Sequence, residues 1–174
     1  MESMAAQTIE LPYYEIPAPS KVFTPGTVAS RTIDGLGFRY YWATEGLVEK
    51  DLNFKPTDES RSAVETLHHI YELSEIIVNA TLKKVNKGVE EDLSFKEERE
   101  KTLLNLKKAS DILKDSEDVS EFVIKFKTKE LPFWNVLNGP LADAIWHVGQ
   151  IVSFRRSSGN PFPKGVSVLM GTKQ

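Results

Sequence analysis

The sequence has no cysteine among its 174 residues. This absence excludes disulfide bonds, a protein thiol nucleophile and zinc sites built on cysteine, and it fits a reducing cytoplasm. Long hydrophobic runs are also missing, since no apolar stretch approaches the roughly 18 residues that a membrane-spanning helix needs. The N-terminal region lacks a basic segment followed by an apolar run, so we expect no signal peptide and a cytoplasmic location.

A surplus of positive charge is likewise missing. The chain has 22 Lys and Arg against 25 Asp and Glu, for a net charge of -3. Without a basic surplus we expect neither a nucleic-acid partner nor a membrane surface. No phosphate-binding glycine loop and no Gly-x-Ser-x-Gly elbow occurs either. We expect the partner to be a small-molecule substrate.

The residues that are present indicate one domain preceded by an arm. Four of the nine prolines fall within residues 1–26, at Pro12, Pro17, Pro19 and Pro25. Proline lacks a backbone donor, which predicts an extended arm there. The length and the 40% hydrophobic content of the chain suit a single soluble domain, which we place at residues 27–174.

Within residues 27–174, four stretches have helical periodicity, at about 27–47, 60–84, 94–115 and 133–157. Thr27 is the expected cap of the first helix. Ser62-x-x-Glu65 and Ser94-x-x-Glu97 have the spacing of capping boxes. A short strand-like alternation covers residues 122–127, and the C-terminal tail reads as irregular. The pattern predicts an all-α fold, a four-helix bundle with an extended N-terminal arm and short irregular or strand-like segments.

Asp143 and His147 are the most informative pair. They lie at i and i+4 in an apolar helical segment, so both side chains share one helix face, one turn apart. A carboxylate and an imidazole placed in this way can hold one divalent metal ion. The alternative is a hydrogen-bonded pair without metal. Gln150 lies on the same polar stripe, which would be costly to bury without partners or a ligand.

The other two histidines are neighbours, so they point in different directions on a helix that turns about 100° per residue. Around the predicted second helix, His69 falls among apolar residues and His68 falls in the middle of a charged arc. His69 is therefore the expected third ligand, and His68 is expected near the site but at the surface.

These residues resemble the DinB/YfiT-like superfamily of metal-dependent four-helix-bundle proteins. Residues 62–70 read SAVETLHHI, which is similar to the Ser-(five or six residues)-His-Ile/Leu pattern of the second helix in that family. Residues 143–151 read DAIWHVGQI, which is similar to the His-x-x-x-His-x-Gly-Gln-Ile/Leu pattern of its last helix. The resemblance covers about residues 28–158 and places the first histidine of the family at His69.

The resemblance implies a divalent metal site formed by His69, Asp143 and His147. The chain departs from the family at Asp143, where the family usually has histidine. Aspartate still ligates divalent ions but shifts the preference toward harder ones, so zinc, nickel, manganese and iron all stay open. The departure also admits a family member that has lost its metal.

The resemblance further implies a metal-dependent hydrolase or a thiol-dependent transferase, because characterised relatives include bacillithiol- and mycothiol-dependent enzymes. A low-molecular-weight thiol is then an expected cofactor. The alternative is a non-catalytic ligand-binding or stress-response bundle protein without bound metal.

A second face of the last predicted helix suggests self-association. Ala142, Gly149 and Ser153 are small residues on one side of it, with Trp146 beside them. Small residues allow close helix approach and tryptophan is a frequent interface anchor, so we expect a homodimer. The same face could instead meet the helix at 27–47 within one chain.

Overall fold

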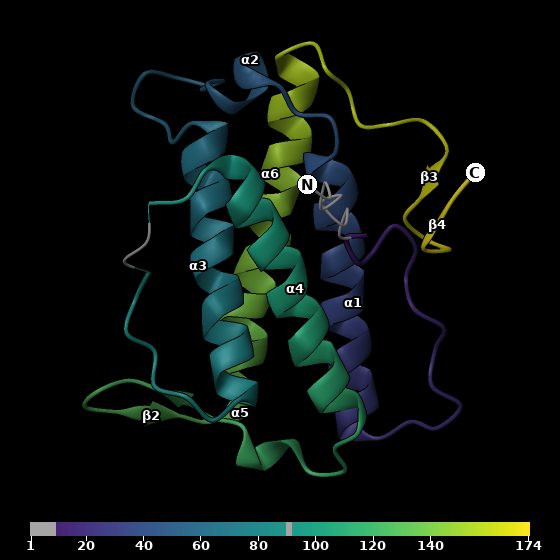
Figure 1. The fold of residues 1–174 in the computed structure, drawn as a ribbon, viewed down its shortest axis with the longest axis vertical. Helices are drawn as coiled ribbons and strands as arrows, with labels where there is room; N and C mark the ends of the chain where they lie inside the picture. The colour runs from purple at the N-terminus through teal and green to yellow at the C-terminus, as the bar shows by residue number, and fades with distance from the viewer. Residues whose placement is uncertain (1–9, 90–91) are drawn as a thin grey trace, which may run out of the picture.

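The computed structural model describes residues 10–89 and 92–174, and the described chain is mostly helical (Figure 1). Four helices are long: α1 (Pro25–Thr44), α3 (Ala63–Thr81), α4 (Phe95–Lys114) and α6 (Ala142–Ser157). The short elements are α2 (Glu49–Leu52), η1 (Val119–Glu121), β1 (Ile124–Lys125), β2 (Glu130–Leu131), α5 (Phe133–Val136), η2 (Leu137–Leu141), β3 (Val166–Ser167) and β4 (Thr172–Lys173).

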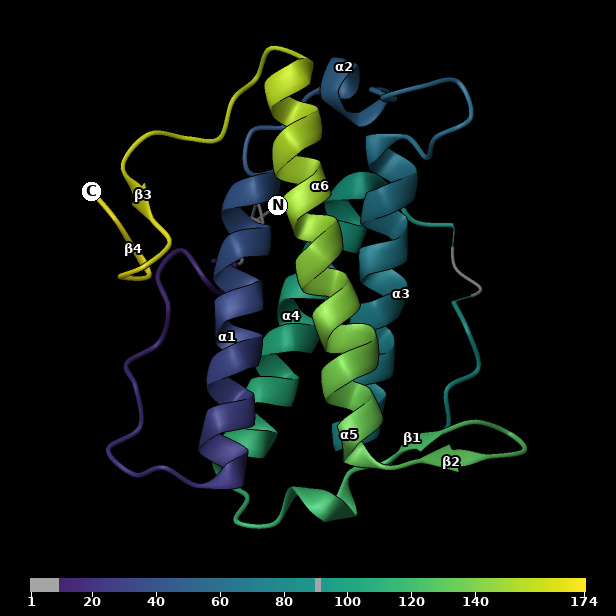
Figure 2. The ribbon, with the colours of Figure 1, turned by 180° about the vertical axis from the view of Figure 1, so that it is seen from behind.

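The long helices run alongside one another and enclose one apolar core. Helix α4 lies against both α1 and α3, and α6 packs against α3 and α1 from the opposite side (Figures 1 and 2). Each long helix contributes fully buried side chains, among them Ile33, Leu36, Leu67, Ile77, Leu103, Leu113 and Ile151. This packing places α3 and α6 side by side, which is the arrangement that the candidate metal ligands require.

Two helix starts follow the predicted capping boxes. The hydroxyl of Ser62 accepts from the backbone N–H of Glu65, and the Glu65 carboxylate accepts from the backbone N–H of Ser62. Ser94 and Glu97 repeat the pattern at the start of α4. Each box satisfies helix donors that have no partner within the helix. Of the two predicted caps of the second helix, Ser60 and Ser62, the structure has Ser62, so α3 begins three residues after the predicted residue 60, while α4 begins where the sequence predicted.

The predicted start of the first helix is wrong by three residues. Thr24 caps α1, Pro25 occupies its first turn, and Thr27 is the third helical residue of the capping box. Proline at the first helical position loses no hydrogen bond and already has a helical φ. The sequence reading assigned Pro25 to the arm and therefore placed the helix start too late.

The predicted helix at 133–157 is not continuous. It is divided into α5, η2 and α6, and Gly139 within η2 has φ of -95° and ψ of -110°, outside helical values. Pro140 follows directly. Proline has no N–H to donate and its ring clashes with the preceding turn, which explains the break. Helix α6 therefore begins one residue before Asp143.

Two antiparallel strand pairs lie among the described residues. Strand β1 pairs with β2 through Ile124–Leu131, which confirms a strand signal in this region. Strand β3 pairs with β4 through Val166–Lys173, so the prediction of an irregular tail is wrong there. Two-residue strands are too short to show a period in sequence, and that is why the sequence does not indicate the second pair.

The described part of the predicted arm contacts the helices at selected points. Tyr13 is 3% exposed and packs against Gly37 of α1, where a Cβ atom would lie 2.4 Å from its ring. Phe23 is 92% exposed. Residues 1–9 of the predicted arm lie outside the described residues. Among the residues that the structure does describe, no helix combines the length and apolar character needed to cross a membrane.

The small-residue face of α6 points to solvent. Ala142, Trp146, Gly149 and Ser153 are all exposed, and a Cβ atom built at Gly149 meets no atom within 4 Å. The alternative that this face packs on the first helix within the chain is therefore wrong. An exposed face remains available to a second copy of the chain, so the homodimer stays a prediction.

Candidate metal centre

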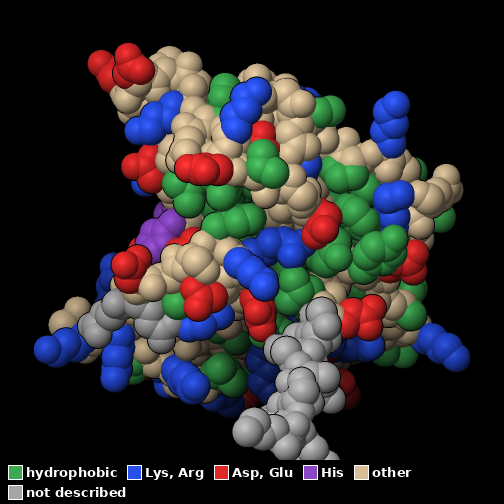
Figure 3. Space-filling model, turned by 45° about the horizontal axis from the view of Figure 1, so that its top comes forward, with side chains coloured by type: hydrophobic (Ala, Val, Ile, Leu, Met, Phe, Trp, Pro, Cys, Tyr) green, Lys and Arg blue, Asp and Glu red, His purple; other side chains and the backbone are tan. Residues whose placement is uncertain are grey.

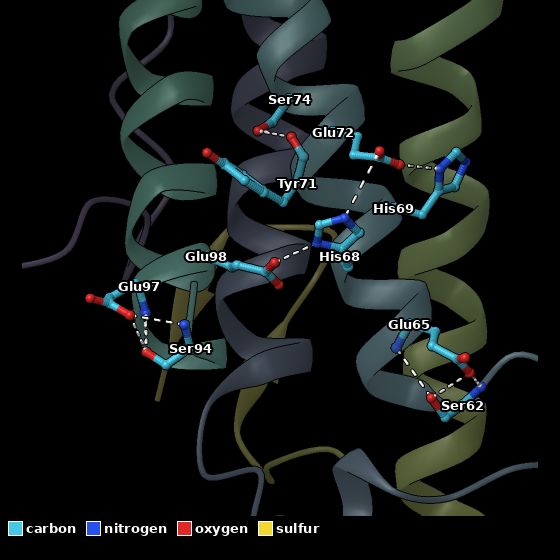
Figure 4. A network of polar contacts seen from close by, with 10 residues as sticks. All are labelled: Ser62, Glu65, His68, His69, Tyr71, Glu72, Ser74, Ser94, Glu97 and Glu98. Atoms are coloured by element: carbon cyan, nitrogen blue, oxygen red, sulfur yellow. Dashed lines mark hydrogen bonds and ion pairs between the residues drawn. The ribbon is translucent and has the colours of Figure 1, made fainter. Parts of the chain in front are cut away.

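Helix α3 presents His68 and His69 in different directions, as the helical spacing predicted. The side chain of His69 turns toward α6, where its Nε2 lies 3.2 Å from Oδ2 of Asp143. The side chain of His68 turns toward α4 (Figure 4). One step of about 100° along the helix separates a histidine that can join α6 from one that cannot.

Helix α6 contributes Asp143 and His147 from successive turns. Oδ1 of Asp143 lies 3.4 Å from Nε2 of His147, as expected for an i, i+4 pair on one helix face. The neighbouring apolar arc, with Ala144, Val148 and Ile151, is buried in the core. Burial of that arc fixes the rotation of α6 and directs the polar pair toward α3.

The three side chains form one compact group. One ligand atom each from His69, Asp143 and His147 lies within 4.8 Å of the others, and the two imidazole rings meet edge to face with centroids 4.9 Å apart. Metal–ligand bonds of about 2.1 Å in a tetrahedral site separate neighbouring ligand atoms by about 3.4 Å. The two contacts to Asp143 have this spacing, so the group can hold a metal ion.

The far side of each imidazole is tied to its own helix. Nδ1 of His69 lies 3.3 Å from Oε2 of Glu72, and Nδ1 of His147 lies 2.7 Å from Oε1 of Gln150. Carboxylate and amide oxygens accept hydrogen bonds, so a proton on either Nδ1 would be donated to them. A neutral imidazole that donates through Nδ1 has only a lone pair on Nε2.

In that tautomer the lone pairs of His69 and His147 face the carboxylate oxygens of Asp143, which are also acceptors. Three acceptors directed at one point repel one another unless positive charge lies between them. Either an additional proton on the imidazoles or one divalent cation satisfies the arrangement. The donor set of two nitrogens and one oxygen suits first-row divalent ions.

The group is reachable from outside. The side chain of Asp143 is 42% exposed, that of His69 26% and that of His147 16%. Figure 3 shows histidine atoms at the surface beside acidic side chains, and His68, outside the group, is the most exposed of the three histidines at 45%. Exposure to water distinguishes this group from a buried structural cluster.

His68 has partners that the sequence did not indicate. Its Nδ1 lies 2.5 Å from Oε1 of Glu98, a residue of α4 that is 5% exposed. The hydrogen bond with Glu98 raises the pKa of His68. The predicted surface position of His68 is confirmed in part. Its side chain is 45% exposed, but Nδ1 of its ring contacts Glu98 of α4.

Glu72 is the contact that sequence reasoning missed. Its helical position groups it with the charged, outward arc, yet its carboxylate reaches both histidines (Figure 4). The signal is present in the spacing, since residue 72 is i+4 from His68 and i+3 from His69. Gln150, which was expected near the site, does contact His147.

No protein-family model, no curated protein and no solved structure matches the chain. Membership of the DinB/YfiT-like superfamily therefore stays an expectation drawn from the two short motifs. The function of the site has to follow from its own geometry.

Proposed function

We propose that this protein is a four-helix bundle of DinB/YfiT type that binds one divalent metal ion through His69, Asp143 and His147. The observation that supports it best is the convergence of two imidazole Nε2 atoms on one carboxylate, with both Nδ1 atoms engaged elsewhere. A divalent cation removes the repulsion between these acceptors with a single ligand. Three protein ligands leave coordination positions for water or substrate, as in catalytic sites.

The proposed activity is that of a metal-dependent hydrolase or a thiol-dependent transferase with a small-molecule substrate. A divalent ion held at this site would lower the pKa of a bound water or thiol and polarise a carbonyl group. The protein groups hold that ion on one side and leave the side near Asp143 open to solvent. The chain has no cysteine, so a thiol would be supplied by a low-molecular-weight cofactor.

Metal titration by calorimetry, with zinc, nickel, manganese and iron(II) salts on chelator-treated protein, tests the proposal. We expect one ion per chain and a loss of at least about 100-fold in affinity when any ligand is replaced, as in His147→Ala. His68→Ala is the comparison variant: His68 is the neighbouring histidine and is held by Glu98 of α4, so it reaches the site only through Glu72 and its loss should weaken binding far less than loss of a ligand does.

Three results would count against the proposal. Absence of binding by the wild-type protein would leave a metal-free ligand-binding or stress-response protein as the better reading. Loss of binding in His68→Ala but not in His69→Ala would assign the wrong histidine. If metal binds, calorimetry with a bacillithiol-type thiol follows, and failure of every thiol to bind the loaded protein would remove the transferase branch.

A further inference from the structure

Glu72 lies between two adjacent histidines of α3. Its Oε2 is 3.3 Å from Nδ1 of His69 and its Oε1 is 3.9 Å from Nε2 of His68 (Figure 4). The first contact is a hydrogen bond and the second is an ion pair when His68 is protonated. One carboxylate therefore contacts the candidate ligand histidine and the histidine that is not a ligand.

Helix geometry makes this position specific. Residues three and four apart are neighbours on a helix surface, so only residue 72 is both i+3 from His69 and i+4 from His68. The contact with Glu72 takes Nδ1 of His69 and leaves its Nε2 for Asp143. The carboxylate thereby selects which nitrogen of His69 faces α6.

The second contact of Glu72 is anchored in turn. His68 is held through its Nδ1 by Glu98, whose side chain is 6% exposed on α4. The ring of Tyr71 also lies edge-on to His68, with centroids 6.4 Å apart. A histidine restrained from α4 gives Glu72 a fixed partner, although Glu72 itself is 45% exposed. Figure 4 shows the resulting chain of contacts from α4 across α3 to the face that meets α6.

The other candidate ligand histidine has a matching but uncharged support. Gln150 lies three residues after His147 and takes its Nδ1 at 2.7 Å, as Glu72 takes that of His69. Both imidazoles are thus oriented by the residue at i+3 of their own helix. The difference is one of charge, because a carboxylate acceptor increases the electron density of the imidazole and an amide does so less.

We infer that Glu72 is the residue that positions His69 in the metal site. It fixes the tautomer and ring orientation of His69 and strengthens Nε2 as a metal donor, and it is itself steadied by the His68–Glu98 pair. The inference rests on the proposed metal function. Groups that accept from a ligand histidine typically contribute 10- to 100-fold to metal affinity.

The experiment measures zinc affinity by calorimetry for wild type, Glu72→Ala, Glu72→Gln and a control, Glu75→Ala. Glu75 is a half-buried carboxylate of the same helix that contacts Asn105 instead of a histidine. We expect Glu72→Ala to weaken binding about 10- to 100-fold. Glu72→Gln should recover part of that loss, because its amide oxygen still accepts from Nδ1, and Glu75→Ala should bind as the wild type does.

Cobalt(II) spectra and thermal melts of the metal-free proteins separate positioning from stability. A positioning role changes the d–d absorption of the cobalt-loaded protein while the metal-free melting temperature of Glu72→Ala stays close to that of Glu75→Ala. If wild type binds zinc and Glu72→Ala binds it equally well, the inference fails and the metal site stands. If wild type binds no metal, both fail together.

Discussion

Two polar clusters inside this protein differ in one decisive respect. The first, the Asp34 cluster, joins Tyr13, Ser30, Asp34 and Ser110 where the N-terminal segment meets α1 and α4, and all four residues are buried. The second is the group of His69, Asp143 and His147 between α3 and α6. Both put a carboxylate among hydrogen-bonding side chains, yet the first is buried and the second reaches solvent and has a donor set that suits a metal ion.

In the Asp34 cluster donors meet acceptors. The hydroxyls of Tyr13 and Ser110 both donate to Oδ1 of Asp34, at 3.1 and 2.6 Å, and Ser30 lies 2.8 Å from Ser110. Nothing has to be added for these groups to be satisfied, so the cluster is structural. Between α3 and α6 two imidazole Nε2 atoms converge on one carboxylate at a surface that solvent reaches, and either protons on the imidazoles or a cation can satisfy them. A solvent-accessible polar cluster that a cation can satisfy is a candidate functional site.

The largest expected effect distinguishes the clusters by stability. Asp34→Ala removes the shared acceptor and leaves the Tyr13 and Ser110 hydroxyls buried without it. We expect the free energy of unfolding to fall by about 3 kcal/mol. Zinc affinity should stay unchanged in the protein that remains folded, and urea unfolding together with calorimetry measures both quantities.

A variant of the His69, Asp143 and His147 group should lose metal binding and keep its stability. His147→Ala removes a partly exposed side chain that faces Asp143. The free energy of unfolding of the metal-free protein should therefore change by less than about 1 kcal/mol, while metal binding is lost. Equal loss of stability in the two variants would show that both clusters are structural.

The next largest expected effect is a fall in the melting temperature when the metal is removed. A ligand that binds only the folded state at 100 times its dissociation constant stabilises that state by about 2.7 kcal/mol. We therefore expect EDTA to lower the melting temperature of the zinc-loaded wild type and of Asp34→Asn by a similar amount. His69→Ala should show no response to EDTA, and a response equal to that of the wild type would place the metal elsewhere.

The sequence predicted the features that depend on local helical geometry. Helical spacing alone directed His69 toward α6 and His68 away from it, because a rotation of 100° per residue does not depend on tertiary detail. The capping boxes at Ser62 and Ser94 were equally local and set two helix starts correctly. Four long helices in a mostly helical chain could also be predicted, because helical periodicity is a local property of the sequence.

The sequence did not predict contacts that depend on side-chain rotamers or on packing between distant segments. The contact of Glu72 with both histidines depends on rotamers, which a helical projection omits. The pairing of Asp34 with Tyr13 joins residues 21 positions apart through an arm that has no periodic pattern. The break at Gly139 was local and readable, since Pro140 stands inside the predicted helix, but apolar periodicity on both sides outweighed it.

A smaller effect concerns pH. Desolvation by burial raises the pKa of Asp34, although hydrogen bonds from Ser110 and Tyr13 oppose the rise. A carboxyl whose folded pKa exceeds its unfolded value stabilises the fold most below the unfolded pKa, and that stability is lost as pH rises through the folded pKa. Asp34→Asn should remove this dependence, since the amide does not titrate.

Urea unfolding at intervals between pH 3.5 and 7 tests the direction. Stability of the wild type relative to Asp34→Asn should decline as pH rises and then level off. A relative increase over the same range would mean that the cluster holds Asp34 preferentially as a carboxylate, with its hydrogen bonds outweighing desolvation.

The smallest effect tests the outer face of α6, where neither cluster lies. We propose that Ala142, Trp146, Gly149 and Ser153 form a homodimer interface, because a 72% exposed tryptophan lies one turn from a glycine with open space above it. Gly149 also lines a surface pocket, and a two-fold axis would let each Trp146 approach that pocket on the other copy. Light scattering at micromolar concentration should then give twice the chain mass of 19.6 kDa.

Gly149→Ala makes the same test through stability. In an exposed helix interior this change stabilises by about 0.5–1 kcal/mol, because alanine loses less backbone entropy on folding. The added methyl group meets nothing within one chain, so an isolated subunit should become more stable by that amount. In a dimer the methyl group occupies space that Trp146 of the other copy needs. The dissociation constant of the variant dimer should therefore be higher than that of the wild type, while each subunit keeps its fold. A wild-type mass near 19.6 kDa, with Gly149→Ala simply more stable, would assign this face to solvent and end the dimer proposal.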